Sequence, residues 1–343
     1  MIIQWFTGYI VNENNTADFT FCVRNKSMKK PRLISYINTF LVIVSLTFTS
    51  RVFADVSVAV SKTPLSTPWY IAEHQGFFKK ERVNVKIVDM IGGHRCLKAM
   101  LSGEVNMATT SDSPIAFQSL HNKKFKILTT FVTSYNDVKL MTKKSSGILK
   151  ARHLIGKKVG TVIGASSHYF LVKFLIDNNV NPNKIEVVHV KPNAMPKALA
   201  SGEVDAISVW EPYGYISKSL LKDDLHILPA KKTYRETFNL VSNEKFIINN
   251  EKNAEKIIRA LKNASDFIQN KPEKAKRIVY ERLKLDGKFV DSIWDDFNFN
   301  LKLDQLLITT IEDQAYWLIE SKRIKTTLIP KYLDFIDKKY LRD

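Results

Sequence analysis

Cysteine is almost absent from this sequence, since only Cys22 and Cys96 occur among 343 residues. Two cysteines exclude a disulfide-rich scaffold and a cysteine-rich zinc or iron–sulfur site. Glycine and proline are also scarce, with 12 and 11 residues, which excludes collagen-like and low-complexity chains. Acidic residues are outnumbered 34 to 52 by Lys and Arg, which gives a net charge of +18. This charge suits anionic partners of any size, from a small oxyanion to a nucleic acid or a lipid surface.

Sequence motifs of several enzyme and nucleotide-binding classes are missing as well. No G-x-x-x-x-G-K-[ST] phosphate loop and no G-x-S-x-G nucleophile elbow occurs, and no G-x-G-x-x-G follows a strand. The seven histidines lack H-E-x-x-H or comparable spacing, so we expect no metal site and no cofactor. Lys322, Arg323 and Lys325 form only a short basic cluster without interleaved aromatic residues. We therefore expect no nucleic-acid partner.

The most apolar segment lies near the N-terminus and predicts export. Residues 28–32 read MKKPR, a run of 16 mostly apolar residues follows, and a small-residue site ends at Ala54. The apolar run is shorter than the roughly 20 residues of a membrane-spanning helix, and the order of these features is that of a secretory signal. We assign residues 28–54 to a signal peptide cleaved after Ala54, and residues 1–27 to a non-native extension. The alternative is an uncleaved amphipathic anchor.

An internal repeat predicts the architecture of the remaining chain. Residues 98–110 read KAMLSGEVNMATT and residues 197–209 read KALASGEVDAISV, so that six residues coincide. In each copy we expect a short helix to end at a glycine, Gly103 or Gly202, because glycine readily takes the left-handed conformation that terminates helices. A strand follows at once, and a β-branched segment precedes each copy. The pattern predicts strand–helix–strand units of parallel sheet in two α/β lobes.

Three loops fall where a ligand would bind between two such lobes, beyond the carboxyl ends of strands. They read GASSH at 164–168, TSDSP at 110–114 and WEPY at 210–213. Ser166 or Ser167 suits a helix N-cap, and the glycine before them lets the backbone approach an anion closely. Each loop also has a purely structural interpretation, as a helix cap or as the site of a core tryptophan. Their equivalent positions at strand ends favour ligand binding.

Four segments resemble periplasmic substrate-binding proteins of the nitrate, sulfonate and taurine uptake class. The resemblance extends from about residue 56 to residue 325, and its segments are TPWYIAEHQGFF through TSDSP (67–114), LIGKKVGTVIGASSHYFLVKFLIDNNV (154–180), ALASGEVDAISVWEPY (198–213) and NLKLDQLLITTIEDQAYWLIESKRI (300–324). It implies an α/β, type II periplasmic-binding-protein fold with a ligand cleft between two lobes. We expect residues 55–133 plus 245–343 in lobe 1 and residues 134–244 in lobe 2.

The resemblance also implies which residues face the ligand. Asp112 is unusual among them because it is acidic, so it either receives a ligand amine or caps a helix. The residues at the family's ligand-facing positions are Ser66, Thr67, Trp69, Gly92, Gly93, His94, Ser111, Asp112, Ser166, Ser167, His168, Trp210 and Glu211.

The resemblance implies a monomeric periplasmic solute-binding protein without enzyme activity. Its ligand would be small and anionic or zwitterionic, such as an alkanesulfonate, taurine or a nitrate-like ion, and its partner an ABC permease in the inner membrane. The alternative is a binding protein or enzyme of pyrimidine or thiamine-precursor metabolism on the same fold. Enzymes of that group carry a Cys-rich motif, which a chain left with Cys96 alone does not supply. A ligand-sensing role beside a membrane receptor is a third interpretation.

Overall fold

The computed structural model describes residues 55–121, 124–232 and 234–341. The expected N-terminal extension and signal peptide, residues 1–27 and 28–54, lie outside these ranges. Within them, no helix has both the length and the apolar character needed to cross a membrane.

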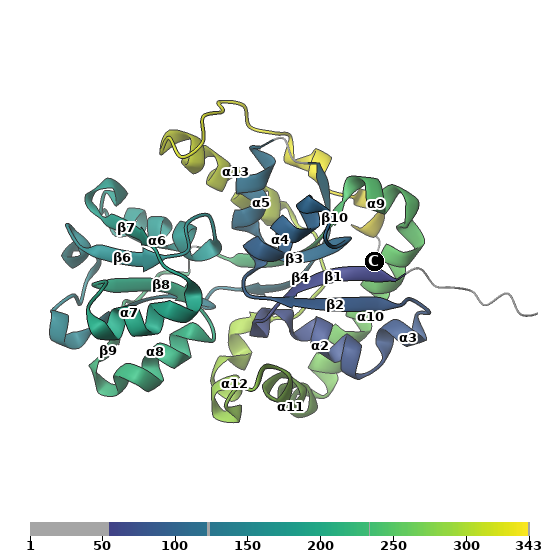
Figure 1. The fold of residues 1–343 in the computed structure, drawn as a ribbon, viewed down its shortest axis with the longest axis horizontal. Helices are drawn as coiled ribbons and strands as arrows, with labels where there is room; N and C mark the ends of the chain where they lie inside the picture. Colours follow the sequence, from purple (N-terminus) through teal and green to yellow (C-terminus); the bar gives the residue numbers. More distant parts are fainter. Residues whose placement is uncertain (1–54, 122–123, 233, 342–343) are drawn as a thin grey trace, which may run out of the picture. The chain divides into compact units, whose positions relative to one another are not determined.

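Six strands form the first sheet, in the order β11-β4-β10-β3-β1-β2 (Figure 1). Strand β1 pairs in parallel with β2 and β3, whereas β10 pairs antiparallel with both β3 and β4. Strand β11 pairs antiparallel with β4. The strands are β1 (Val56–Ser61), β2 (Val85–Met90), β3 (Met107–Ser111), β4 (Phe125–Ser134), β10 (Glu236–Asn243) and β11 (Phe297–Asn298).

Helices cover both faces of the first sheet. Because the side chains of a strand alternate between its faces, each strand contributes to two hydrophobic cores. Val58 and Val60 of β1 belong to one hydrophobic core, and Ala59 between them belongs to another. The first core includes side chains of α2 (Thr67–His74), α3 (Phe77–Lys80), α9 (Glu244–Asn249), α10 (Glu251–Asn270), α11 (Pro272–Leu283) and α12 (Gly287–Ile293). The second includes side chains of α4 (Gly93–Ser102), α5 (Asp112–Ser119) and α13 (Gln305–Glu320).

The second sheet has five strands in the order β7-β6-β8-β5-β9. Strand β6 pairs in parallel with β7 and β8, and β5 pairs antiparallel with β8 and β9. One hydrophobic core joins this sheet to its helices. The elements are β5 (Val138–Lys143), β6 (Lys158–Thr161), β7 (Glu186–His189), β8 (Ala206–Trp210), β9 (Leu225–Ile227), α6 (Ser166–Asp177), α7 (Met195–Ser201) and α8 (Tyr213–Leu221).

The structure confirms the internal repeat predicted from the sequence. Helix α4 ends at Gly103 and helix α7 at Gly202, with φ angles of +84° and +79° that are left-handed in both cases. Strands β3 and β8 follow and are the third strand from one edge of their sheets. The expected α/β architecture with two similar lobes is therefore correct.

The expected boundary at residue 244 is wrong, because β10 belongs to the first sheet. Residues 236–243 pair with β3 on one side and β4 on the other, although the sequence placed them in the second lobe. By its composition, an apolar antiparallel strand could belong to either sheet. Only its pairing with neighbouring strands shows to which sheet it belongs. The chain passes between the sheets in two crossing segments, one linking β4 to β5 and one linking β9 to β10.

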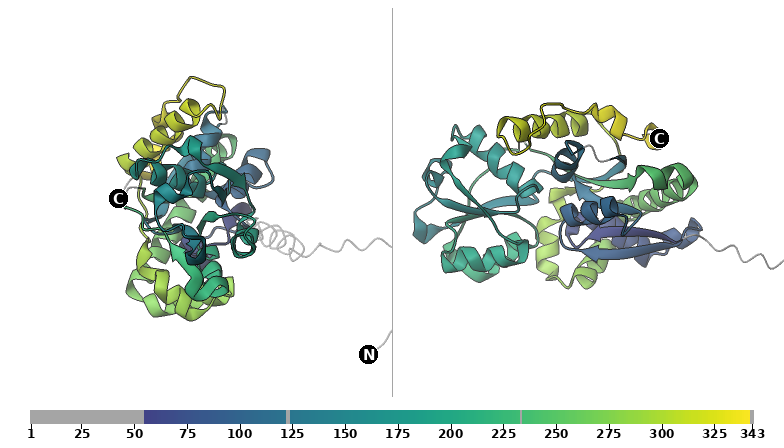
Figure 2. Two further views of the ribbon diagram at one scale, coloured as in Figure 1. Left: turned by 90° about the vertical axis from the view of Figure 1, so that its left-hand side faces the viewer. Right: turned by 45° about the horizontal axis from the view of Figure 1, so that its top comes forward.

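Helix α13 connects the helices of the two sheets. It packs on α5 of the first sheet (Figure 2). Its Trp317 ring lies against His168 and Tyr169 of α6, with ring centroids 5.0 Å and 5.8 Å away. The helices of the two lobes are therefore in direct contact here.

Candidate functional site

A small cavity lies between the two sheets, at the carboxyl ends of β1, β3 and β8. Its volume is about 20 Å³, which is room for about one water molecule. A larger ligand fits only if the walls move apart. The cavity is lined by Ser61, Thr63, Leu65, Gly92, Gly93, His94, Ser111, Pro114, Asp137, Ala165, Ser166, Trp210, Glu236 and Phe238.

Three helices begin at this cavity, and none has a side-chain cap. The N-cap residues are Gly92 for α4, Ser111 for α5 and Ala165 for α6, and no side chain of these residues bonds to its helix. The first N–H groups of a helix have no partner inside the helix, and the helix dipole makes that end favourable for negative charge. The three uncapped starts, from both lobes, therefore form a wall suited to an anion.

Two glycines allow α4 to begin this close to the end of β3. Gly92 has a φ angle of +89°, which is in the left-handed region that favours glycine. A Cβ atom on Gly93 would lie 2.8 Å from Cα of Thr110 and 3.2 Å from the backbone nitrogen of Ser111. A side chain at Gly93 would therefore push the start of α4 away from the start of α5.

The ring of His94 meets the ring of Trp210 across the cavity. Their centroids are 6.4 Å apart with an interplanar angle of 65°, an edge-on contact. Burial, with smaller effects of Arg95 and His189, lowers the pKa of His94 to about 4, so the ring is neutral at pH 7. Its buried Nδ1 has no hydrogen-bond partner among the residues that the structure describes. The two lobes also touch where the Thr63 hydroxyl donates to the Glu211 carbonyl, at 3.4 Å.

Two carboxyl groups line the side of the cavity where the chain crosses between the sheets. Asp137 lies in the first crossing segment and Glu236 ends the second, and they are only 2% and 3% exposed. Among the described residues, no N–H or hydroxyl group donates to either oxygen of Asp137 or to Oε2 of Glu236. The two carboxyl groups lie within hydrogen-bond reach of each other, and the Ser166 side chain lies within reach of Glu236. Burial raises the pKa of Asp137 to about 8, and Lys139 only partly offsets it. Burial and then the charge of Asp137 raise the pKa of Glu236 well above its usual range.

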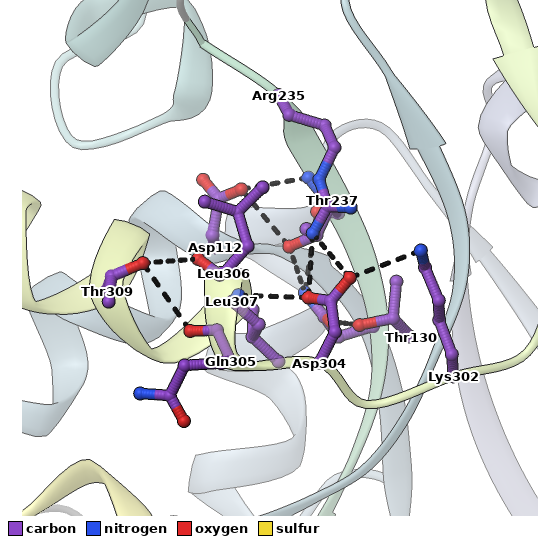
Figure 3. A network of polar contacts seen from close by, with 11 residues as sticks. Asp112, Thr130, Arg235, Thr237, Lys302, Asp304, Gln305, Leu306, Leu307 and Thr309 are labelled. Carbon is purple, nitrogen blue, oxygen red and sulfur yellow. Dashed lines mark hydrogen bonds and ion pairs between the residues drawn. The ribbon is translucent and has the colours of Figure 1, made fainter.

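Polar contacts hold the residues on both sides of Glu236 in place (Figure 3). Arg235 donates two hydrogen bonds to Asp304, at 2.7 Å and 2.9 Å, and Asp304 also caps α13 through the backbone N–H of Leu307. The backbone N–H and the hydroxyl of Thr237 donate to Oδ2 of Asp112 at 2.9 Å and 3.1 Å. Anchored neighbours on both sides fix the position of Glu236 at the cavity.

The cavity brings together part of the candidate set drawn from the sequence. Gly92, Gly93, His94, Ser111, Ser166 and Trp210 all line it. The sequence did not single out the other lining residues as ligand-facing, among them the two buried acids Asp137 and Glu236. An acidic residue between two strands is the only signal at Asp137, and it resembles an ordinary loop residue.

Asp112 does not line the cavity, and the helix-cap role considered for it is wrong. It is fully buried and receives hydrogen bonds from the Tyr234 hydroxyl at 2.6 Å, Gln314 at 2.9 Å and Thr237. It is not the N-cap of α5, which is Ser111. Its carboxyl group ties α5, α13 and β10 together.

Three candidates from the first loop lie behind the cavity in the first lobe. Trp69 is fully buried and packs on Phe78 and Phe131, with centroid distances of 5.8 Å and 6.2 Å. The Thr67 hydroxyl donates to the Pro64 carbonyl at 2.6 Å. Ser66 is buried beside them, and like the other two it is absent from the cavity wall. Their positions serve the packing of α2.

Three candidates from the second lobe also make contacts away from the cavity wall. The Ser167 hydroxyl pairs with that of Thr161 at 2.9 Å. His168 packs on Trp317, and burial lowers its pKa to about 3. Glu211 forms a buried ion pair with Lys139 at 2.8 Å. Within the described ranges, no three His, Cys, Asp or Glu side chains are grouped so that they could hold a metal ion.

Comparison with protein-family models shows to which family the chain belongs. The model of the NMT1/THI5-like family matches residues 63–275, more than half of the sequence. The chain belongs to the NMT1/THI5-like family. This match covers the starts of α4, α5 and α6 and both crossing segments.

Two curated relatives of this NMT1/THI5-like protein are binding proteins by name. The taurine-binding periplasmic protein of Escherichia coli (strain K12) is 27% identical over 180 residues, which are 52% of this chain and 55% of that protein. The chain thus aligns with about half of that relative. A Bacillus subtilis (strain 168) relative, named for aliphatic sulfonate binding, is 24% identical over 80% of this chain and 84% of its own length.

Solved structures confirm the fold of this NMT1/THI5-like protein. The alkanesulfonate-binding protein SsuA from Xanthomonas axonopodis pv. citri, bound to MOPS, aligns with a TM-score of 0.73 at 15% identity, over 83% of this chain and 98% of that chain. The periplasmic nitrate-binding protein NrtA from Synechocystis PCC 6803 aligns with a TM-score of 0.60 at 14% identity, over 74% of each chain. The expected periplasmic-binding-protein fold is therefore correct.

Proposed function

We propose that this protein is a periplasmic solute-binding protein that holds a small anionic or zwitterionic ligand in the cavity between its two sheets. The observation that carries this proposal is the meeting of three uncapped helix starts, α4, α5 and α6, at one cavity wall. Free N–H groups at helix starts bind anionic groups such as sulfonates and carboxylates. The names of the taurine- and sulfonate-binding relatives support the same ligand chemistry.

The side chains around this wall would complete the ligand's contacts. The hydroxyls of Ser111 and Ser166 lie at the starts of α5 and α6, where a hydroxyl can donate to an anionic oxygen. Trp210 and the neutral His94 supply ring surface for the apolar part of the ligand. Since the cavity has only about 20 Å³ of free volume, the lobes must separate to admit a ligand. We propose that the crossing segments permit this movement.

Export and delivery complete the proposed role. The basic and apolar segment 28–54 supports secretion to the periplasm with cleavage after Ala54. The relatives are periplasmic binding proteins by name, so we propose an ABC permease of the inner membrane as the partner that receives the ligand.

An enzymatic function on the same fold is disfavoured by the position of the one described cysteine. Cys96 is fully buried in the core between α4 and the first sheet. Burial raises the pKa of its thiol to about 12, which leaves it protonated and unreactive at neutral pH. Cys96 is a packing residue and cannot serve as a nucleophile for chemistry in the cavity.

Binding itself can be tested by calorimetry and thermal unfolding with the exported protein. We expect taurine, an alkanesulfonate or nitrate to raise the melting temperature, because a ligand that binds only the folded state adds about 2.7 kcal/mol of stability at a concentration of 100 times Kd. Sodium chloride at equal ionic strength is the control for unspecific anion effects. If no ligand of a panel of sulfonates, carboxylates and oxyanions gives heat or a melting shift, the proposed function is wrong.

A further inference from the structure

We propose that Asp137 and Glu236 form an acidic subsite that binds a protonated amine of the ligand, so that the cavity selects zwitterions over simple anions. The inference rests on the proposed function, since it names the ligand class that the same cavity takes. Neither Asp137 nor Glu236 is among the ligand-facing residues predicted from the sequence.

The unpartnered oxygens of these two residues call for hydrogen-bond donors. Both oxygens of Asp137 and Oε2 of Glu236 are buried and receive no hydrogen bond from an N–H or hydroxyl group of the described residues. The two carboxyl groups lie within hydrogen-bond reach of each other, and both residues line the cavity. A buried polar group without a partner costs about 1 to 3 kcal/mol. An alkylammonium group carries three N–H donors and one positive charge, which match three acceptor oxygens. A ligand amine would therefore replace the proton that the two carboxyl groups can share and would donate to both of them.

The nearby cations of the protein are already engaged elsewhere. Lys139 bonds to Glu211 at 2.8 Å and to the Asn136 carbonyl at 2.6 Å, and it lines a separate cavity of about 200 Å³. Arg235 points to Asp304, which it contacts through two hydrogen bonds. Neither Lys139 nor Arg235 lines the cavity that holds Asp137 and Glu236. The positive charge that this pair lacks is left for the ligand to supply.

The two polar regions of the cavity suit the two ends of a zwitterion. Helix starts at Gly93, Ser111 and Ser166 favour a negative group. The carboxyl pair, in the crossing segment and at the start of β10, favours a positive group. A simple anion can bind beside the two carboxyl groups only in their protonated form, whereas an ammonium group favours their ionised form.

Matched ligand pairs test this subsite by calorimetry. Taurine is compared with 1-propanesulfonate, in which a methyl group replaces the ammonium, and β-alanine is compared with butyrate. For the unchanged protein we expect the amine-bearing member of a pair to bind at least tenfold more tightly. Asp137→Asn, Glu236→Gln and the double variant should lose most of this preference while keeping or improving affinity for the amine-free member.

A matched control removes one negative charge beside the same crossing segment. Asp296 accepts a hydrogen bond from Asn136 at 2.9 Å and lines the separate cavity of Lys139. Asp296→Asn should keep the preference for the amine-bearing ligand. Circular dichroism confirms that each variant is folded.

The relative affinity of the unchanged protein for amine-bearing and amine-free ligands tests the subsite even if a variant does not fold. Equal or tighter binding of 1-propanesulfonate and butyrate would overturn the subsite and leave the proposed function standing. In that case the carboxyl groups act as neutral donors to an anion, and Asp137→Asn should weaken both members of a pair equally. Absence of any binding to the unchanged protein would instead overturn the proposed function, and the subsite with it.

Discussion

The two polar walls of the cavity differ in charge preference and in origin. The anion-favouring wall comes from helix starts within the lobes, those of α4 and α5 in the first lobe and that of α6 in the second. The carboxyl pair comes from the passage between the lobes, where Asp137 follows β4 and Glu236 begins β10. We infer from this difference that the lobes supply general anion affinity, while the crossing segments decide which ligand is retained.

The strongest test of the helix wall is a methyl group at Gly93. Gly93→Ala places a Cβ atom 2.8 Å from Cα of Thr110, so the start of α4 must shift at a cost of about 1 to 3 kcal/mol. We expect both members of each ligand pair to lose affinity together, because the shared anionic end loses its contacts. Calorimetry measures the affinities, and urea unfolding measures the stability.

Gly103, at the other end of the same helix, is the control for this variant. Gly103→Ala strains a residue with a φ angle of +84° but meets nothing within 4 Å, so it should lower stability and leave both affinities unchanged. Equal losses of affinity in the two variants would mean that the start of α4 has no special part in binding.

Two adjacent serines separate binding from packing within α6. Ser166 lines the cavity, and loss of its hydroxyl should weaken anion binding by roughly 1 to 3 kcal/mol with little change in stability. The hydroxyl of Ser167 is 2.9 Å from that of Thr161. Ser167→Ala should therefore lower stability by about 1 kcal/mol and leave affinity unchanged. The reverse pattern in calorimetry and thermal unfolding would contradict the assignment of Ser166 to the wall.

A gradual pH dependence of binding sharpens the description of the carboxyl pair. Binding of an ammonium requires at least one ionised carboxylate in the pair, and the pKa of Asp137 is raised to about 8. Taurine affinity should rise by up to tenfold per pH unit as the pH approaches 8, while 1-propanesulfonate should show no such rise. Affinity for taurine that falls between pH 6 and pH 8 would contradict ammonium binding by the pair.

The stability of the ligand-free protein should change with pH in the opposite direction. The protonated form of Asp137 is favoured in the folded state, so between pH 4 and pH 8 the unfolded chain binds fewer protons and stability falls as the pH rises. Asp137→Asn should flatten this slope. The charge of Lys139 lowers the pKa of Asp137, whereas the charges of Glu211 and Asp296 raise it. The slope of stability against pH therefore depends on all four charged residues. Urea unfolding at several pH values measures it.

Much of the fold could be predicted because it follows from local and repeated patterns. The glycine that ends a helix and the strand that follows recur at Gly103 and Gly202, and helix starts follow directly from strand ends. The place of β10 could not be predicted, because its pairing with β3 and β4 joins residues more than a hundred positions apart.

Asp112 and Asp137 show why only part of the site could be predicted. Both acids follow a strand in the sequence, and Asp112 looked the more promising because a helix begins there. In the structure, Asp112 is surrounded by donors from Tyr234, Thr237 and Gln314. In the part of the chain that the structure describes, no N–H or hydroxyl group donates to Asp137, which lies within hydrogen-bond reach of the Glu236 carboxyl group. The distinction depends on side chains supplied from distant segments, which no local pattern reveals.

A crystal structure of the protein with taurine tests the central claim most directly. The account predicts sulfonate oxygens within hydrogen-bond distance of the backbone N–H groups at the starts of α4, α5 and α6, and the ammonium in contact with Asp137 and Glu236. Taurine bound in the reverse orientation, or bound outside the cavity between the two sheets, would contradict it.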